Sequence, residues 1–231
     1  MNRLDGKVAL ISGAARGIGA ETARLMVEAG ARVAIGDVLD ERGRETARAL
    51  GEAALYQHLD VTGEESWREI IAAAVARFGG LDVLVNNAGM FLGKGIEETS
   101  LDEWHRLAGV NLTGVFLGTK LCLPALRERG AQQPHGSAIV NLASVAGLVG
   151  SQLDPLYSMT KGGVTLFTKS AALEFGRKGY RIRVNSIHPG VIETDMGAQT
   201  FTARANNLGS NDVVAARRLA LSHHPIGRLG V

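Results

Sequence analysis

The sequence has little cysteine, proline or aromatic residue, and neither sign of charge predominates. Its single cysteine, Cys122, excludes a disulfide within the chain and is typical of proteins of a reducing compartment. The 25 lysines and arginines are balanced by 23 aspartates and glutamates, and both signs are spread along the whole chain. No basic stripe could therefore follow a nucleic-acid backbone, and we expect no nucleic-acid partner.

Long hydrophobic runs are also lacking. Charges at Arg3, Asp5 and Lys7 interrupt the start of the chain before an apolar run of signal-peptide length could form. The longest uncharged stretch, 136–153, contains polar residues and repeated glycines, which favours a strand and a loop over a membrane span. We therefore expect a cytoplasmic protein with no membrane partner.

Apolar residues and glycine are plentiful. The chain has 231 residues, of which 45% are apolar and 21% charged, so it can bury a large core. Its 30 glycines indicate many points where the backbone turns sharply or approaches something closely. No linker rich in proline or serine divides the chain, and we expect one domain over residues 1–231.

Short aliphatic runs alternate with longer segments of helical periodicity, which indicates βαβ units and a parallel sheet. The right-handed crossover rule then predicts a doubly wound α/β sheet with the strand order 3-2-1-4-5-6. The predicted strands are Val8–Ser12, Arg32–Asp37, Ala54–Leu59, Val83–Asn86, Ala138–Ala143 and Arg183–Ile187. The clearest predicted helices are Ile18–Glu28, Glu64–Arg77, Leu101–Arg127 and Leu156–Gly176, with a polar loop over Glu128–Gly136.

A glycine-rich turn joins the first predicted strand to the first helix. It contains Gly13, Gly17 and Gly19, and such a turn lets a pyrophosphate rest on the free amides of a helix N-terminus. The second strand ends in Asp37, about twenty residues further on, where a carboxylate can accept the hydroxyl groups of an adenosine ribose. Together these features predict a Rossmann-type dinucleotide site.

The same turn bears on the choice of dinucleotide. The carboxylate of Asp37 would repel the additional phosphate of NADP, whereas Arg16 could pair with it or simply be solvated. Val38 and Leu39 stand where a second basic residue would be expected in an NADP site. The sequence therefore favours NAD.

No metal site is expected. The six histidines show no metal-ligand spacing, and the adjacent pair His223 and His224 does not share a helical face. The remaining histidines are His58, His105, His135 and His188.

Several further motifs occur in a fixed order along nearly the whole chain. In the identity and order of these motifs the chain resembles the short-chain dehydrogenase/reductases. Among the members of this family it resembles most the bacterial NAD-dependent hydroxysteroid dehydrogenases. The motifs that carry the resemblance are the glycine turn, Asp60-Val61, Asn86 to Gly89, Asn111, Ser144, Tyr157 with Lys161, Pro189-Gly190 and Thr194.

The resemblance implies a catalytic set of Asn111, Ser144, Tyr157 and Lys161. In such enzymes the tyrosine exchanges a proton with the alcohol, the serine bonds the same oxygen, the lysine also holds the nicotinamide ribose, and the asparagine backbone holds a water that relays protons. It also implies a cofactor-binding set of Gly13, Arg16, Gly17, Ile18, Gly19, Asp37, Asp60, Val61, Asn87, Ala88, Gly89, Tyr157, Lys161, Pro189, Gly190, Ile192 and Thr194.

The spacing of Tyr157 and Lys161 has its own physical consequence. Residues four apart lie on one face of a helix, one turn from each other. A tyrosine with a pKa of about 10 needs about 4 kcal/mol of stabilisation of its anion to act as a base near neutral pH. An ammonium about 4 Å away supplies at most about that much before desolvation is subtracted. Full activation would therefore need the positive nicotinamide ring as well, which predicts that the cofactor binds first.

The expected substrate is a hydrophobic secondary alcohol or ketone of the steroid or alicyclic type. Segment Glu193–Leu221, with mixed loop and helix signals, is expected to form a lid over it. An NADPH-dependent reductase of 3-oxoacyl thioesters and a cofactor-sensing protein without catalysis remain alternatives. The predicted substrate lining is Met90, Phe91, Leu148, Val149, Leu153, Val191, Met196 and Phe201.

The end of the chain departs from the family pattern. The resemblance implies a further helix and a seventh strand after the segment His224 to Arg228, whereas this sequence ends at Val231. We therefore expect a sheet without that final strand, and a homodimer or homotetramer built on the long helices Leu101–Arg127 and Leu156–Gly176.

Overall fold

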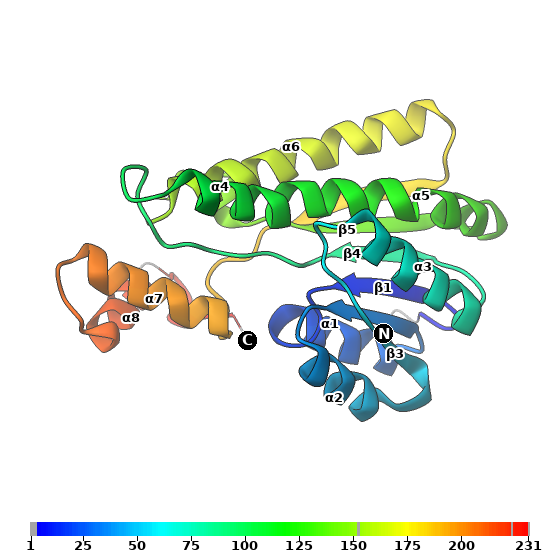
Figure 1. Ribbon diagram of the computed structural model, residues 1–231, viewed down its shortest axis with the longest axis horizontal. Helices are drawn as coiled ribbons and strands as arrows, with labels where there is room; N and C mark the ends of the chain where they lie inside the picture. Colours follow the sequence, from blue (N-terminus) through cyan, green and yellow to red (C-terminus); the bar gives the residue numbers. More distant parts are fainter. Residues whose placement is uncertain (1–3, 152, 223, 231) are drawn as a thin grey trace.

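Six parallel strands form the central sheet of the protein (Figure 1). The structure, a computed structural model, describes residues 4–151, 153–222 and 224–230. The strand order β3-β2-β1-β4-β5-β6 confirms the predicted doubly wound topology, and β3 and β6 are the edge strands of the described sheet. The strands are β1 (Val8–Ser12), β2 (Arg32–Asp37), β3 (Ala54–His58), β4 (Val83–Asn86), β5 (Ser137–Leu142) and β6 (Ile182–Ile187).

Helices cover both faces of this sheet. The α-helices are α1 (Gly17–Glu28), α2 (Asp40–Leu50), α3 (Glu64–Phe78), α4 (Leu101–Ala108), α5 (Gly114–Gln132), α6 (Pro155–Arg177), α7 (Asp195–Asn207) and α8 (Val213–Ser222). Short 3-10 turns, η1 (Gly51–Ala53) and η3 (Val145–Gly147), and a π-helical segment, η2 (Gly109–Thr113), complete the helical elements of the described chain.

The alternation of side chains along the strands divides the core in two. In β1, Val8 and Leu10 lie in the larger cluster with residues of α3, α5 and α6, whereas Ala9 and Ile11 lie in the smaller cluster with residues of α1 and α2. Successive side chains of a strand point to opposite faces, so each strand of an all-buried parallel sheet reads as an unbroken apolar run. All five residues of β1 are accordingly buried.

The long helical run between β4 and β5 corrects one boundary. The prediction that a loop begins at Glu128 is wrong, because α5 continues to Gln132. The physical reason lies in Arg129, whose Nε is 3.2 Å from Oδ2 of the buried Asp82. A polar side chain that reaches a buried carboxylate stabilises one more helical turn that composition alone does not reveal.

The same run, Leu101–Gln132, is long and apolar enough to cross a membrane by length and composition. Its apolar character is accounted for by packing, because Leu117, Cys122 and Leu126 lie in the larger core cluster. Cys122 is fully buried, and burial raises the pKa of its thiol.

The predicted lid segment, 193–221, forms α7 and most of α8, which pack against each other at one side of the molecule (Figure 1). Phe201 of α7, Ala220 of α8 and Leu229 near the chain end form their small shared core. Gly230 forms an isolated parallel bridge with Ile192, which ties this pair back to the segment after β6. His223, one of the six histidines, lies outside the described residues.

Candidate active site

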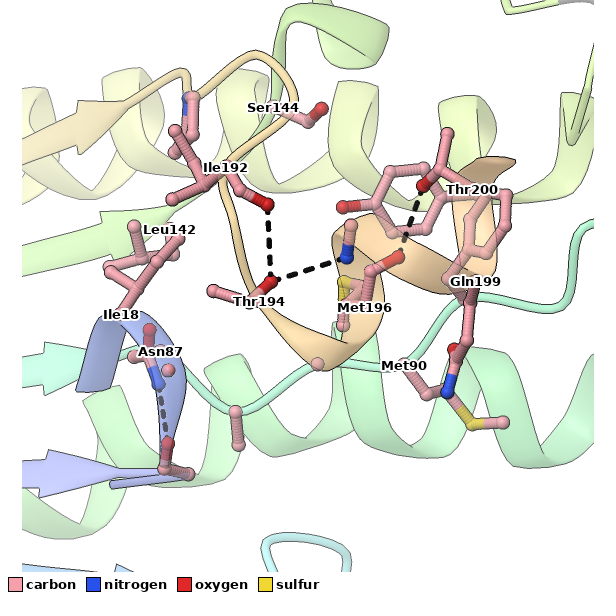
Figure 2. Close-up of a pocket in the computed structure, with 18 of the residues that line it drawn as sticks. Ile18, Asn87, Met90, Leu142, Ser144, Ile192, Thr194, Met196, Gln199 and Thr200 are labelled. Carbon is pink, nitrogen blue, oxygen red and sulfur yellow. Dashed lines mark hydrogen bonds between the residues drawn. The ribbon is translucent and has the colours of Figure 1, made fainter. Parts of the chain in front are cut away.

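A cleft of about 1150 Å³ lies at the carboxyl ends of the strands. It runs from the glycine turn after β1, past the ends of β2, β4 and β5, to α7. Figure 2 shows the part between Ile18 at the start of α1 and Thr200 of α7. Parallel sheets of this kind bind ligands at this edge, and pockets for one small ligand occupy about 300–1,000 Å³. The cleft is therefore large enough for a dinucleotide together with a small substrate.

The glycine turn packs directly against the chain after β4. Gly13 has a φ of +65°, and a Cβ there would lie 2.7 Å from Cα of Ala88, so only glycine fits. The amide of Asn87 secures this approach, because its Nδ2 donates to the carbonyl oxygens of Ser12 and Gly13 at 3.0 and 2.7 Å. Asn87 and Ala88 thus shape the turn on which a cofactor would rest.

Helix α1 presents its first turn to the cleft without an internal cap. Its N-cap residue Arg16 makes no side-chain bond to the helix amides, and the first turn contains no acidic residue. Free amides and the positive end of the helix dipole form a ready site for an anion. This arrangement fits the pyrophosphate of a dinucleotide, with Gly17 and Ile18 lining the same place.

Asp37 at the end of β2 is buried, and backbone amides hold its carboxylate. Oδ2 accepts a hydrogen bond from Ala15 N and Oδ1 accepts one from Leu39 N, each at 3.0 Å. One basic residue near this end was missed by the sequence analysis, since the exposed Arg42 of α2 also lines the cleft. Arg42 reaches the cleft because it lies in the first turn of α2. The sequence analysis considered only the residues directly after Asp37 and so did not identify it. Arg16, the other candidate for a phosphate, forms an ion pair with Asp195 of α7.

Tyr157, Lys161 and Ser144 meet at the other end of the cleft. The ammonium of Lys161 lies 5.6 Å from the centre of the Tyr157 ring and donates to the carbonyl oxygen of Leu142 at 2.6 Å. Burial lowers the pKa of Lys161 to about 8. Burial raises the pKa of Tyr157, the Ser144 hydroxyl lowers it, and the charge of Asp154 raises it. In the protein without a positive nicotinamide ring the Tyr157 phenol therefore has a raised pKa, in agreement with the expectation that Lys161 alone does not activate it fully.

Asn111 lies in the π-helical segment and does not line the cleft. Its side chain is fully buried and clasps the backbone of Met90, accepting from the amide at 2.8 Å and donating to the carbonyl at 3.0 Å. It also donates to Thr160 of α6 at 3.1 Å. Single π-helical turns are rare and occur frequently at functional sites. Asn111 thus joins the chain after β4 to the helix that carries Tyr157.

Asp154 was missed by the sequence analysis. It is fully buried and caps α6, with Oδ1 accepting from Tyr157 N at 2.8 Å. Oδ2 accepts from the amides of Leu92 and Gly93 at 3.0 and 2.9 Å. An aspartate followed by Pro155 is a strong helix-start signal, which could have identified the cap but not its partners across the cleft.

We expect Asp154→Ala to destabilise the fold and disturb the position of Tyr157 together. Three partly buried amides would lose their buried acceptor, which corresponds to a loss of about 2–4 kcal/mol and a fall in Tm of roughly 5–15 °C, measured by thermal unfolding. Ser100→Ala, which removes an exposed cap from α4, is the matched control and should cost about 1 kcal/mol. A variant of Asp154 as stable as this control would contradict the role of the buried clasp.

His188 holds the backbone of Ser144. Its Nδ1 lies 3.1 Å from the Ser144 carbonyl oxygen, and its Nε2 lies 2.9 Å from the hydroxyl of Ser186. Because a carbonyl only accepts, Nδ1 must carry the proton and Nε2 of a neutral ring accepts from Ser186. The histidine thus packs and orients, as a histidine without metal spacing is expected to do.

The predicted residues gather in this one cleft with few exceptions. Of the catalytic and cofactor-binding sets, only Asn111 and Gly19 are absent from its lining, and both support residues that line it. Two predicted substrate contacts do not line the cleft: Leu148 is exposed, and Phe201 packs into the core between α7 and α8. The predicted contacts that do line the cleft are Met90, Phe91, Val149, Leu153, Val191 and Met196.

Comparisons with known proteins agree with this geometry. Residues 7–205 match the short chain dehydrogenase family. A 3-alpha-(or 20-beta)-hydroxysteroid dehydrogenase of Mycobacterium tuberculosis is 50% identical over 194 residues, covering 84% of this chain and 72% of the relative. A trans-4-hydroxycyclohexanecarboxylate dehydrogenase of Sinomonas cyclohexanicum is 45% identical over 206 residues, covering 85% and 76%.

The fold gives the same answer. A crystal structure of a short-chain dehydrogenase/reductase (glucose/ribitol dehydrogenase) from Brucella melitensis superposes with a TM-score of 0.83 at 32% identity, covering 98% of this chain and 84% of that one. The resemblance drawn from the motifs is confirmed, and the chain belongs to the short-chain dehydrogenase/reductase family, oxidoreductases that act on CH–OH groups with a nicotinamide dinucleotide.

Proposed function

We propose that this protein transfers a hydride between NAD(H) and a hydrophobic secondary alcohol or ketone of the steroid or alicyclic type. The observation that carries the proposal is the meeting of Tyr157, Lys161 and Ser144 in the cleft that begins at the glycine turn. When bound, the nicotinamide ring accepts or supplies the hydride.

The side chains at this end supply the proton chemistry. Tyr157 takes the hydroxyl proton of the alcohol during oxidation and returns it during reduction. Ser144 lies beside the phenol, where its hydroxyl bonds the same substrate oxygen and stabilises charge on it. Lys161 is buried with its ammonium bonded to the carbonyl oxygen of Leu142. From there it would lower the free energy of the tyrosinate and hold the ribose of the cofactor, as the family resemblance implies.

The cofactor is assigned to NAD because Asp37 offers a fixed carboxylate at the adenosine end. Its two oxygens are oriented by Ala15 and Leu39, so the negative charge does not turn away from an additional phosphate. The ion pair of Arg16 with Asp195 engages one of the two cations at this end, and the exposed Arg42 is the other.

The substrate class rests on the lining near Tyr157. Phe91 packs edge-on against the Tyr157 ring at 5.5 Å, and Met90, Leu153 and Val191 continue the apolar surface. Such a wall suits a ring of carbons better than a sugar with its many hydroxyl groups. Two of the relatives named above are, by name, dehydrogenases of a hydroxysteroid and of a hydroxycyclohexanecarboxylate, which agrees with this chemistry.

A screen of secondary alcohols with NAD and with NADP, read by the absorbance of the reduced nicotinamide, tests the proposal. Oxidation of steroid or alicyclic alcohols with NAD is the expected result. Activity confined to NADPH and 3-oxoacyl thioesters would replace it with the thioester reductase. Binding of a dinucleotide with no turnover of any alcohol would favour a cofactor-sensing protein.

We also propose that two copies associate through an exposed apolar stripe on α6. Met159, Leu166 and Leu173 are 60%, 65% and 70% exposed and recur at intervals that keep them on one helix face. A two-fold axis would lay this stripe against itself. Leu166→Glu should convert the oligomer to monomer in light scattering, whereas Val214→Glu on α8 should not; a wild-type monomer would refute the interface.

A further inference from the structure

A cation of the cleft has a buried donor atom for which the described residues supply no acceptor. Arg204 of α7 lines the cleft, and its Nε is buried without a hydrogen-bond partner. Its guanidinium forms no ion pair with the described residues. A buried donor without an acceptor is costly, and such groups in native proteins call for an explanation. A role in binding a ligand that accepts from this donor supplies one.

The acidic residues that line the same cleft do not supply the missing partner. Glu193 pairs with Arg217, and Asp195 pairs with Arg16. Asp37 is held by two backbone amides, and Asp60 accepts from the amide and hydroxyl of Thr62. These contacts leave Arg204 as a positive charge facing a ligand space with its neighbouring carboxylates already engaged.

The course of α7 places Arg204 at the substrate end. The helix begins beside the glycine turn, where the methyl carbon of Thr194 lies 3.3 Å from the position of a Cβ on Gly17. At about 1.5 Å per residue, Arg204 lies about 14 Å further along the axis than Asp195. This separation takes it away from the pyrophosphate site.

Contacts of the preceding residue fix the other end of α7. Ala203 lies close to Gly93, since its Cβ is 2.7 Å from the position of a Cβ there, and Phe91 lies at 3.0 Å from the same position. The ring of Phe91 in turn packs on Tyr157 at 5.5 Å. Figure 2 shows Met196, Gln199 and Thr200 along the same helix between its two ends. Arg204 therefore belongs to the part of the cleft that holds the substrate.

We propose that Arg204 binds a carboxylate carried by the substrate, so that the alcohol oxidised is a hydrophobic ring acid. This inference rests on the proposed function and narrows its substrate class. The planar guanidinium matches a carboxylate in a two-point hydrogen bond. A phosphate dianion is the poorer fit, because the other cation near Tyr157, Lys161, is buried and bonded to Leu142.

The test compares hydroxycyclohexanecarboxylates with their carboxamides, which have the same shape without the charge. In the wild type, kcat/KM for the acid should exceed that for the amide by about 10- to 100-fold. Arg204→Met should remove this preference and leave the amide within about twofold. Arg204→Lys should retain part of it. Arg218→Met, on the exposed face of α8, removes one positive charge outside the cleft and should change neither substrate.

A binding measurement separates this inference from the proposed function. Cyclohexanecarboxylate, which has no hydroxyl to oxidise, should bind the NAD-loaded wild type by calorimetry, and Arg204→Met should weaken that binding about 10-fold or more. If no alcohol is oxidised but this difference holds, the proposed reaction fails while the carboxylate site stands. The inference would be overturned if Arg204→Met lost kcat/KM equally for the acid and the amide. It would also be overturned if the wild type and Arg204→Met bound cyclohexanecarboxylate equally well. Arg204→Gln replaces Met if that variant does not fold.

Discussion

Tyr157→Phe is expected to lower kcat for alcohol oxidation by about a thousandfold or more, because general acid–base catalysis typically contributes 10²–10⁴-fold. The ring is retained, so its packing with Phe91 and the dinucleotide affinity should stay close to wild type. Stopped-flow or steady-state turnover gives the first quantity, and fluorescence titration with NAD gives the second.

The control for this variant is Tyr180→Phe. Tyr180 packs against Phe175 and under Arg127, and it does not line the cleft. The Tyr180→Phe variant therefore loses the same hydroxyl group as Tyr157→Phe at a site outside the cleft. Its turnover should match the wild type. A Tyr157→Phe enzyme that retained more than about a tenth of wild-type kcat would mean that another group moves the proton.

The pH dependence follows from the sign of the shift. Burial and the charge of Asp154 raise the pKa of Tyr157 in the protein alone, whereas a positive nicotinamide nearby favours the phenolate. Oxidation needs the deprotonated form, so its rate rises as pH increases through this pKa, and reduction shows the opposite slope. The pKa of Tyr157 should therefore be lower in the complex with NAD than in the protein alone. The midpoint of the pH profile of alcohol oxidation in the NAD complex should accordingly lie below the pKa of Tyr157 in the free enzyme.

The second large effect concerns the dinucleotide. The wild type is expected to prefer NAD over NADP by about 100-fold in kcat/KM, since placing like charges against each other costs several kcal/mol. Asp37→Ser should remove most of this preference, raising kcat/KM for NADP and lowering that for NAD through the lost ribose contact. Steady-state kinetics with both cofactors measure the switch.

Two further variants sharpen this result. The exposed Arg42 lines the same end of the cleft, so the gain for NADP in Asp37→Ser should shrink when Arg42→Met is added. Glu41→Gln removes one exposed negative charge beside it and should leave the preference unchanged. A wild type that prefers NADP would remove the role assigned to Asp37.

Local patterns predicted most of the framework. The apolar runs located all six strands within one residue at each end, and the crossover rule ordered them correctly, because a parallel sheet buried on both faces leaves a strong signal. The glycine turn and the pairing of Tyr157 with Lys161 could be predicted from the sequence, because each depends on residues that lie close together in it.

Contacts between segments far apart in the sequence could not be predicted from it. The clasp of Asp154 on Leu92 and Gly93 joins segments about sixty residues apart, and only the folded chain brings them together. The extension of α5 depends on Arg129 reaching Asp82. Likewise, an apolar residue such as Phe201 can face a cleft or a core, and composition does not distinguish the two.

Helix α7 touches both halves of the cleft, with its first residue paired to Arg16 and its third turn beside Gly93. A ligand that fixes the position of α7 at one end of the cleft therefore also fixes the position of this helix at the other end. By thermodynamic linkage, dinucleotide and alcohol must then strengthen each other's binding by the same factor. The enzyme would discriminate against a substrate that arrives before its cofactor through this cooperativity, in addition to the contact between the two ligands that hydride transfer requires.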